Sequence, residues 1–300
     1  MIRVLPGVRR ALDAGRPVVA LESSVFAQGL PAPANRECVE RMTAAVRAAG
    51  AEPAVTAVAR GVPTLGLEPG ELERFLAGAC VRKVSARDLA AAIVQEADGA
   101  TTVAGSLVLA REAGLRVFAT GGIGGVHRAP AFDESADLAE LARSPLVVVC
   151  AGAKAILDLP ATLERLETHG VAVVGYRTWD LPGFYTAETG LRVSARAESA
   201  ADVAAMYRAD RALGRAQALL VVQPPPADVA LPRRDVERAV AQAVERAAAE
   251  GVRGAAATPH LLAAVTAITE GRSLKVNLAL LEQNARLAGE VAAALAAGPR

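Results

Sequence analysis

Short apolar runs alternate along the chain with longer, alanine-rich amphipathic stretches. The β-branched runs predict strands at 18–23, 54–58, 80–84, 116–120, 146–150, 171–176 and 219–223. The stretches between them predict helices at 36–49, 71–77, 87–96, 102–113, 136–142, 160–168, 200–213, 235–249, 259–269 and 276–296. Alternation of this kind predicts an α/β fold with a largely parallel sheet that helices cover.

Local signals refine some of these boundaries. Asn35 is placed to cap the helix at 36–49, and Ser85 with Asp88 forms a capping-box pattern. The proline-rich stretch 223–226 is the best linker candidate, but helices follow it at once. With 300 residues and no internal repeat, we expect one domain over residues 1–300 with a late subdomain at most.

The composition excludes several classes of protein. A net charge of +1 and an aromatic content of 3% give no general attraction to nucleic acid or membranes. No apolar run reaches membrane-spanning length, and the N-terminus lacks the apolar centre of a signal peptide. Cys38, Cys80 and Cys150 lack metal-ligand spacing, so we expect small buried side chains in a reducing cytoplasm, with Cys150 as an alternative nucleophile.

Lysine is rare, because it contributes only three of the 33 Lys and Arg residues: Lys83, Lys154 and Lys275. The bias itself is typical of coding composition. Lysine differs from arginine in that its amine can lose a proton and attack a carbonyl carbon. Lys154 ends the apolar run that begins at Leu146, where a strand gives way to a loop. Lysines retained by drift alone are the alternative.

Several polar residues follow predicted strands. Glu22, Lys83, His127 and Lys154 all lie at or just beyond such carboxyl ends, where open α/β sheets bind ligands. The glycines at 121–125 follow another strand, but His127 replaces the third glycine of a dinucleotide fingerprint and no clear helix follows. The loop therefore indicates close approach to a small ligand or its phosphate, or else a tight turn.

Two further segments have two interpretations each. Thr101, Thr102 and Val103 open a helix, which suits either a phosphate cradle or ordinary capping. Asp133, Glu134 and Asp137 precede or begin another helix. Their carboxylates suit either a hard cation such as Mg²⁺ or Mn²⁺, or the charge preference of a helix N-terminus.

Four segments form a joint pattern along the chain. They are Leu21-Glu22-Ser23-Ser24, Lys83-Val84-Ser85-Ala86-Arg87-Asp88-Leu89, the run from Thr120 to Leu138, and Cys150-Ala151-Gly152-Ala153-Lys154. Together they resemble the pseudouridine-5′-phosphate glycosidase family, also called indigoidine synthase A-like, and the resemblance covers essentially the whole chain. The chain departs from the family pattern at Gln28, where histidine is common, at Glu134, and in a shortened loop at 128–132.

The resemblance implies a three-layer α/β/α sandwich and a homotrimer. Some relatives carry a fused kinase domain, but 300 residues leave no room for one, so we expect none here. It implies reversible cleavage of the C–C glycosidic bond of pseudouridine 5′-phosphate to uracil and ribose 5-phosphate, with one Mn²⁺ or similar divalent cation per subunit. By motif position, Lys154 is the expected nucleophile, Glu22 the acid/base and Asp133 the metal ligand. The expected substrate contacts are Lys83, Thr102, Val103, His127, Ser135, Ala136, Asp137 and Asn277.

A C-glycoside offers no oxygen or nitrogen leaving atom to protonate, so the two-carboxylate glycosidase scheme suits it poorly. An imine between Lys154 and the opened sugar supplies an electron sink instead, with Glu22 moving the proton. The alternatives are a Schiff-base aldolase acting on another sugar phosphate or C-nucleotide, and a non-enzymatic sugar-phosphate-binding module.

Overall fold

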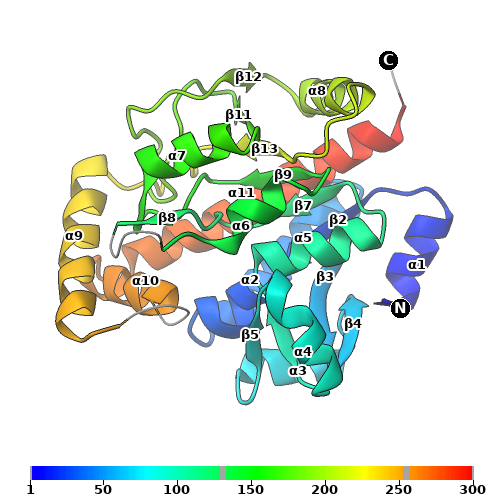
Figure 1. Ribbon diagram of the computed structural model, residues 1–300, viewed down its shortest axis with the longest axis horizontal. Coiled ribbons are helices and arrows are strands. Elements are labelled where there is room, and N and C mark those ends of the chain that lie inside the picture. The colour runs from blue at the N-terminus through cyan, green and yellow to red at the C-terminus, as the bar shows by residue number, and fades with distance from the viewer. Residues whose placement is uncertain (1, 129–132, 253–256, 299–300) are drawn as a thin grey trace.

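The computed structural model describes residues 2–128, 133–252 and 257–298 of the 300-residue chain, and a mainly parallel sheet forms its centre (Figure 1). The strands of this sheet are β1 Arg3–Val4, β2 Val18–Glu22, β3 Glu52–Ala59, β4 Val62–Leu65, β5 Arg82–Val84, β6 Gly99–Thr101, β7 Val117–Ala119, β9 Val147–Cys150, β11 Ala172–Tyr176, β12 Ala195–Ala197 and β13 Leu219–Val222. Their order is β1-β4-β3-β2-β7-β9-β13-β11-β12, with β6 beside β3 and β5 beside β6.

The central strands run parallel and are buried on both faces. β9 and β13 are continuous apolar runs in which every residue is buried, as is typical of strands covered on both sides. Adjacent pairs from β3 through β2, β7, β9 and β13 to β11 are all parallel. Among the described residues, the only antiparallel pairs in this sheet are those of β3 with β4 and with β6. The prediction of a largely parallel sheet is therefore confirmed.

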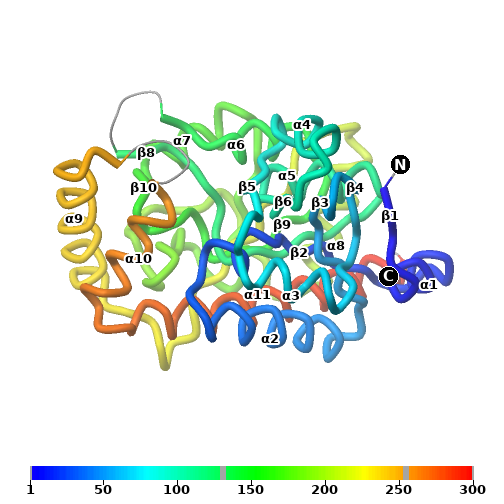
Figure 2. Tube along the Cα trace, turned by 90° about the horizontal axis from the view of Figure 1, so that it is seen from below, coloured from blue at the N-terminus to red at the C-terminus, as the bar shows by residue number. Residues whose placement is uncertain are grey.

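Helices form a layer on each side of the sheet. They are α1 Pro6–Asp13, α2 Ala34–Ala48, α3 Pro69–Ala77, α4 Leu89–Val94, α5 Val103–Glu112, α6 Ala136–Leu141, α7 Leu159–Thr168, α8 Ala200–Ala212, α9 Arg233–Ala249, α10 Ala257–Ile268 and α11 Arg272–Ala296, with short turns η1 Val25–Gly29 and η2 Ala86–Asp88. Figure 2 shows α2 and α11 below the sheet and α5, α6 and α7 above it. This arrangement confirms the predicted three-layer α/β/α sandwich.

Some local predictions were wrong. Asn35 does not cap α2, because the helix already begins at Ala34 and Asn35 lies inside its first turn. The buried Asn35 amide instead donates to the Leu76 carbonyl oxygen at 3.0 Å. The predicted helix at 87–96 is a 3₁₀ turn followed by the short α4, which ends before Glu96 adopts a positive φ of 48°. The Ser85–Asp88 capping box is confirmed.

The long helix α11 brings the C-terminal part of the chain under the sheet. It packs against α2, α8 and the strands β7 and β9. Among the described residues, no helix combines the length and the apolar character needed to cross a membrane.

Candidate active site

The eleven predicted site residues all line one cavity of about 360 Å³. They come from β2, β5 and the segments after β6, β7 and β9, and α10 and α11 add Thr258, Leu262 and Asn277 to its wall. The residues that the sequence predicted are Glu22, Lys83, Thr102, Val103, His127, Asp133, Ser135, Ala136, Asp137, Lys154 and Asn277. Glu22 and the segments after β7 and β9 reach the cavity from the carboxyl ends of parallel strands, as predicted. Lys83 and the segment after β6 reach it from β5 and β6, which run antiparallel to β3, and Asn277 reaches it from α11.

Glu22 is the last residue of β2, and its side chain is buried in the cavity wall. The Thr120 hydroxyl donates to one carboxyl oxygen, and the Ser24 hydroxyl donates to the other at 2.9 Å. Burial raises the pKa of Glu22, while the positive charge of Lys154 and the two hydroxyl bonds oppose that shift. The carboxyl group is thus biased toward its protonated form, which suits a group that delivers a proton.

Lys154 follows β9 on a tight turn that is bonded to the glycine loop. Its backbone N–H donates to the Ile123 carbonyl oxygen at 3.0 Å, and its own carbonyl accepts from the Leu157 N–H at 3.0 Å. Gly152 has a φ of +87°, and a Cβ there would lie 2.3 Å from the Pro182 carbonyl oxygen. Glycine is therefore required to turn the chain and place the half-buried Lys154 in the cavity.

Asp137 connects two segments of the cavity wall. One carboxylate oxygen accepts from the Ala104 N–H in the first turn of α5 at 2.9 Å, and the other accepts from the Gly124 N–H at 2.7 Å. A carboxylate at a helix N-terminus is favoured by the helix dipole. Asp137, predicted as a substrate contact, thus has a structural role that its sequence position did not reveal.

The glycine loop is explained largely by close packing. A Cβ at Gly124 would lie 2.3 Å from the Ser135 hydroxyl oxygen, and one at Gly122 would lie 2.6 Å from the Phe184 ring. A Cβ at Gly125 would meet the Thr162 hydroxyl at 2.4 Å. At positions 122, 124 and 125 the loop therefore has no room for a side chain, and Gly121, Gly122 and Gly124 line the cavity.

The N-terminus of α5, for which the sequence left open a phosphate cradle or ordinary capping, is capped. The Thr102 hydroxyl accepts from the Gly105 N–H at 3.4 Å, and Asp137 occupies the Ala104 amide. Val103, the first residue of α5, lines the cavity beside them. Capping thus takes two of the first amides of this helix.

A network of four fully buried hydroxyl groups lies behind Glu22 and Thr102. The Thr56 hydroxyl contacts the hydroxyls of Thr101 at 2.9 Å and Ser106 at 2.7 Å, and the Ser23 hydroxyl donates to the Thr56 carbonyl at 2.7 Å. The Thr101 N–H donates to Ser23 at 2.8 Å. These bonds join β2, β3, β6 and α5, so they fix the strand end that carries Glu22. The sequence does not reveal this network, because Ser23, Thr56 and Thr101 are far apart in the chain.

Asn284 and Thr120 support the site from outside the cavity lining, and neither was predicted as a site residue. The buried Asn284 amide donates to the Thr120 carbonyl at 2.8 Å and accepts from Gln223 at 2.9 Å. α11 is thereby tied to the end of β7, from which the Thr120 hydroxyl reaches Glu22. The sequence offered one signal for Thr120, because it is a hydroxyl residue at the end of β7, the strand that pairs with β2.

Positive groups share the cavity with Glu22. Desolvation lowers the pKa of Lys83, and the charge of Lys154 adds to that effect, although the side chain stays exposed to solvent. The pKa of His127 is lowered, first by burial and then by the charges of Lys154 and Lys83, while Asp133 opposes the shift. Glu134, where the chain departs from the family pattern, forms an ion pair with Arg165 at 3.0 Å. Of the shortened loop at 128–132, residues 129–132 lie outside the described residues.

The cysteine predictions hold in part. Cys38 and Cys150 are buried as expected, but Cys80 is exposed, because it lies in the turn before β5 with a φ of +62°. Burial raises the pKa of Cys150 to about 12, so its thiol is a poor nucleophile at neutral pH.

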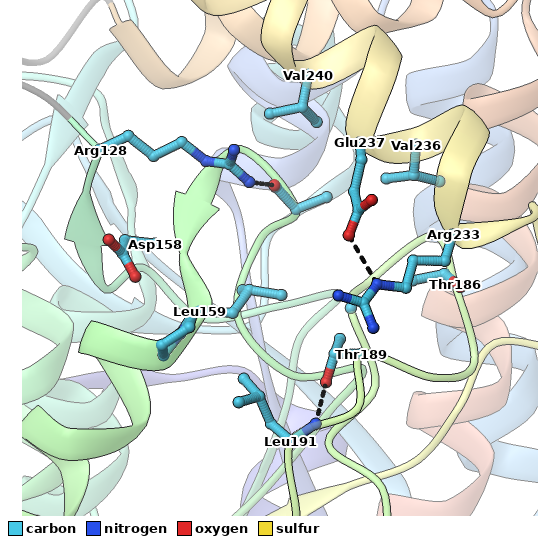
Figure 3. A pocket seen from close by; sticks show the side chains of 13 residues that line it. Arg128, Asp158, Leu159, Thr186, Thr189, Leu191, Arg233, Val236, Glu237 and Val240 are labelled. Carbon is cyan, nitrogen blue, oxygen red and sulfur yellow. Dashed lines mark hydrogen bonds and ion pairs between the residues drawn. The ribbon is translucent and has the colours of Figure 1, made fainter.

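A second cavity of about 450 Å³ lies beyond the turn that follows Lys154, and it holds none of the predicted residues (Figure 3). Arg128 donates to the Leu157 carbonyl at 3.2 Å, and Arg233 pairs with Glu237 at 2.6 Å. The charged groups of this second cavity are thus engaged with each other or with the backbone. The smaller cavity, in contrast, combines a buried carboxyl group with two amines. The smaller cavity is the candidate active site.

An α/β sandwich with amines, an imidazole and a buried carboxyl group beyond the ends of parallel strands is typical of an enzyme that acts on a small molecule. The chain belongs to the family described as indigoidine synthase A like protein, whose profile matches residues 7–294. This finding confirms the resemblance on which the sequence analysis relied.

Curated relatives match along nearly their full length. A protein of Gemmatimonas aurantiaca is 60% identical over 296 residues, covering 99% of this chain and 97% of the relative. One of Chloroflexus aurantiacus is 54% identical, covering 97% of this chain and 98% of the relative. Both are named pseudouridine-5′-phosphate glycosidase, which confirms the prediction that the chain is an enzyme of this family.

Two solved structures share the fold. The prealnumycin C-glycosynthase AlnA, in complex with ribulose 5-phosphate, superposes with a TM-score of 0.91 at 38% identity and covers 99% of this chain and 97% of its own. An indigoidine synthase A-like protein from Thermotoga maritima gives a TM-score of 0.89 at 34% identity, covering 98% and 97%.

Proposed function

We propose that this chain reversibly cleaves the C–C glycosidic bond of pseudouridine 5′-phosphate, giving uracil and ribose 5-phosphate through an imine on Lys154. The observation that carries the proposal is the cavity that holds Lys154 together with the buried Glu22, whose raised pKa suits a proton donor. The names of the relatives at up to 60% identity supply the substrate.

The proposed steps balance without an added oxidant or reductant. The neutral Lys154 amine bonds to the anomeric carbon while the bond from that carbon to the ring oxygen breaks, and the ring oxygen takes a proton. Glu22 then protonates the base carbon. The C–C bond breaks with its electron pair returning to the pyrimidine, and the nitrogen lone pair forms the C=N bond. Water adds to this imine and releases ribose 5-phosphate from Lys154.

The residues also fit a largely hydrated divalent cation. Among the described residues, no three His, Cys, Asp or Glu side chains gather into a metal site, so a cage made only of protein ligands does not fit. Mg²⁺ and similar ions are often held by one carboxylate plus water and substrate phosphate, and Asp133 offers that carboxylate in the cavity. We propose Asp133 as the ligand of one Mn²⁺ or Mg²⁺ per subunit. After treatment with a chelator, added Mn²⁺ should then restore uracil release by the wild-type protein but not by Asp133→Asn.

Borohydride trapping tests the covalent step. Ribose 5-phosphate with borohydride should add the reduced sugar phosphate to Lys154, as peptide mass spectrometry would show. Lys154→Arg should lose both the adduct and uracil release. An adduct in Lys154→Arg, or one located only on Lys83, would exclude Lys154 as the nucleophile.

A second candidate is C–C bond formation with a different sugar phosphate. AlnA, named a C-glycosynthase and bound to ribulose 5-phosphate, favours this candidate at 38% identity. Assays that offer ribose 5-phosphate and ribulose 5-phosphate separately with uracil distinguish the two. The proposed cytoplasmic homotrimer is checked by light scattering of the purified protein and by cell fractionation.

A further inference from the structure

Two neutral amide oxygens in the cavity wall lack hydrogen-bond partners. Among the described residues, Gln28 Oε1 and Asn277 Oδ1 are buried without a partner, and the other such atoms belong to charged groups of Glu140, Arg196 and Arg211. Both amide residues line the candidate active site. A buried acceptor without a partner costs about 1–3 kcal/mol. A ligand that brings N–H donors to these oxygens removes that cost.

The surroundings of the Gln28 amide indicate which of its atoms is available. Gln28 lies in η1 and donates through Nε2 to the Val81 carbonyl at 3.1 Å, so its nitrogen is engaged and its oxygen is not. Asn277 lies early in α11 with only 7% of its surface exposed. The terminal torsions of Gln and Asn have broad energy minima, so a small rotation turns either oxygen toward a ligand.

We propose that Gln28 Oε1 and Asn277 Oδ1 accept the two ring N–H groups of the pyrimidine base. This inference rests on the proposed function. A uracil joined to the sugar through carbon keeps two ring N–H donors, whereas one joined through nitrogen keeps a single donor. Two acceptors therefore select the carbon-linked base, because a nitrogen-linked base leaves one of them buried and unpaired.

Equilibrium binding of uracil, 1-methyluracil and 3-methyluracil in the presence of ribose 5-phosphate tests the inference by calorimetry. Each methyl group blocks one donor, so the wild-type protein should bind each analogue at least about tenfold more weakly than uracil. Gln28→Ala should lose its discrimination against one analogue, and Asn277→Ala against the other. Gln28→Glu keeps the size and the acceptor oxygens, although it loses the Nε2 bond to the Val81 carbonyl. It should retain the discrimination at its own position if the variant to alanine is poorly folded.

Some outcomes contradict the inference. Equal binding of all three bases by the wild-type protein, no binding of uracil, or unchanged discrimination in both alanine variants would each exclude a pair of base acceptors. The borohydride adduct with ribose 5-phosphate is measured in the same preparations. Since it needs no base, its loss in the wild-type protein reports failure of the proposed function separately from failure of this inference.

Discussion

Replacing Asp137 with asparagine tests how the cavity wall is held together. In the wild-type protein, each carboxylate oxygen accepts one backbone N–H, from Ala104 at 2.9 Å and from Gly124 at 2.7 Å. Asp137→Asn keeps one acceptor but turns an NH₂ group toward the second N–H, so one bond is lost and two donors face each other. Hydrogen bonds to charged groups contribute about 1.5–3 kcal/mol each. Because Asp137 is buried, we expect a loss of about 3 kcal/mol in the free energy of unfolding.

Urea unfolding followed by circular dichroism measures this loss, with Asp158→Asn as the matched control. Asp158 caps α7 through one bond to the Ala161 N–H at 3.0 Å, and asparagine caps helices about as well as aspartate. The control should therefore lose less than about 1 kcal/mol. If Asp137→Asn loses no more than Asp158→Asn, the carboxylate does not hold α5 and the glycine loop together, and the reasoning fails.

Two further predictions concern the same cavity. Glu22→Gln should lower uracil release at least about 100-fold. Since folding raises the pKa of Glu22, wild-type stability from this group should fall as pH rises above its ordinary value of 4.5, and the variant should lack that slope in urea titrations at several pH values. Gly124→Ala places a methyl group 2.3 Å from the Ser135 hydroxyl oxygen and should cost about 1–3 kcal/mol by thermal unfolding. Gly70→Ala meets no atom within 4 Å and should not destabilise, so equal melting of the two variants would refute the packing argument.

The sequence predicted the buried strands better than the edges of the sheet. β9 and β13 are continuous apolar runs, and β2 is apolar up to Glu22, a pattern that reports burial on both faces directly. The short β4 and β6 are set by antiparallel pairing with β3, a tertiary contact that leaves little trace in local periodicity. Asn35 shows the same limit, because its amide is recruited by a carbonyl of a different helix.

The candidate site was predictable where chemistry follows a strand end, and not where contacts are long-range. Glu22 and Lys154 directly follow apolar runs, so the sheet topology was sufficient to bring them together. The Thr56 hydroxyl bonds to Ser106, 50 positions away in the chain, and Asp137 bonds to Ala104, 33 positions away, as well as to Gly124. Such partners are defined only once the elements have packed.

The placement of the rare lysines now has a physical explanation at two of three positions. Lys83 and Lys154 both line the cavity, and the charge of Lys154 helps to lower the pKa of Lys83. Arginine at either position would remain fully charged, and two permanent cations in one small cavity repel each other. Lysine at position 83 allows that amine, whose pKa is lowered, to give up its proton more readily than a guanidinium group would. Lys275 is exposed on α11 and is absent from the cavity lining, so this argument does not extend to it.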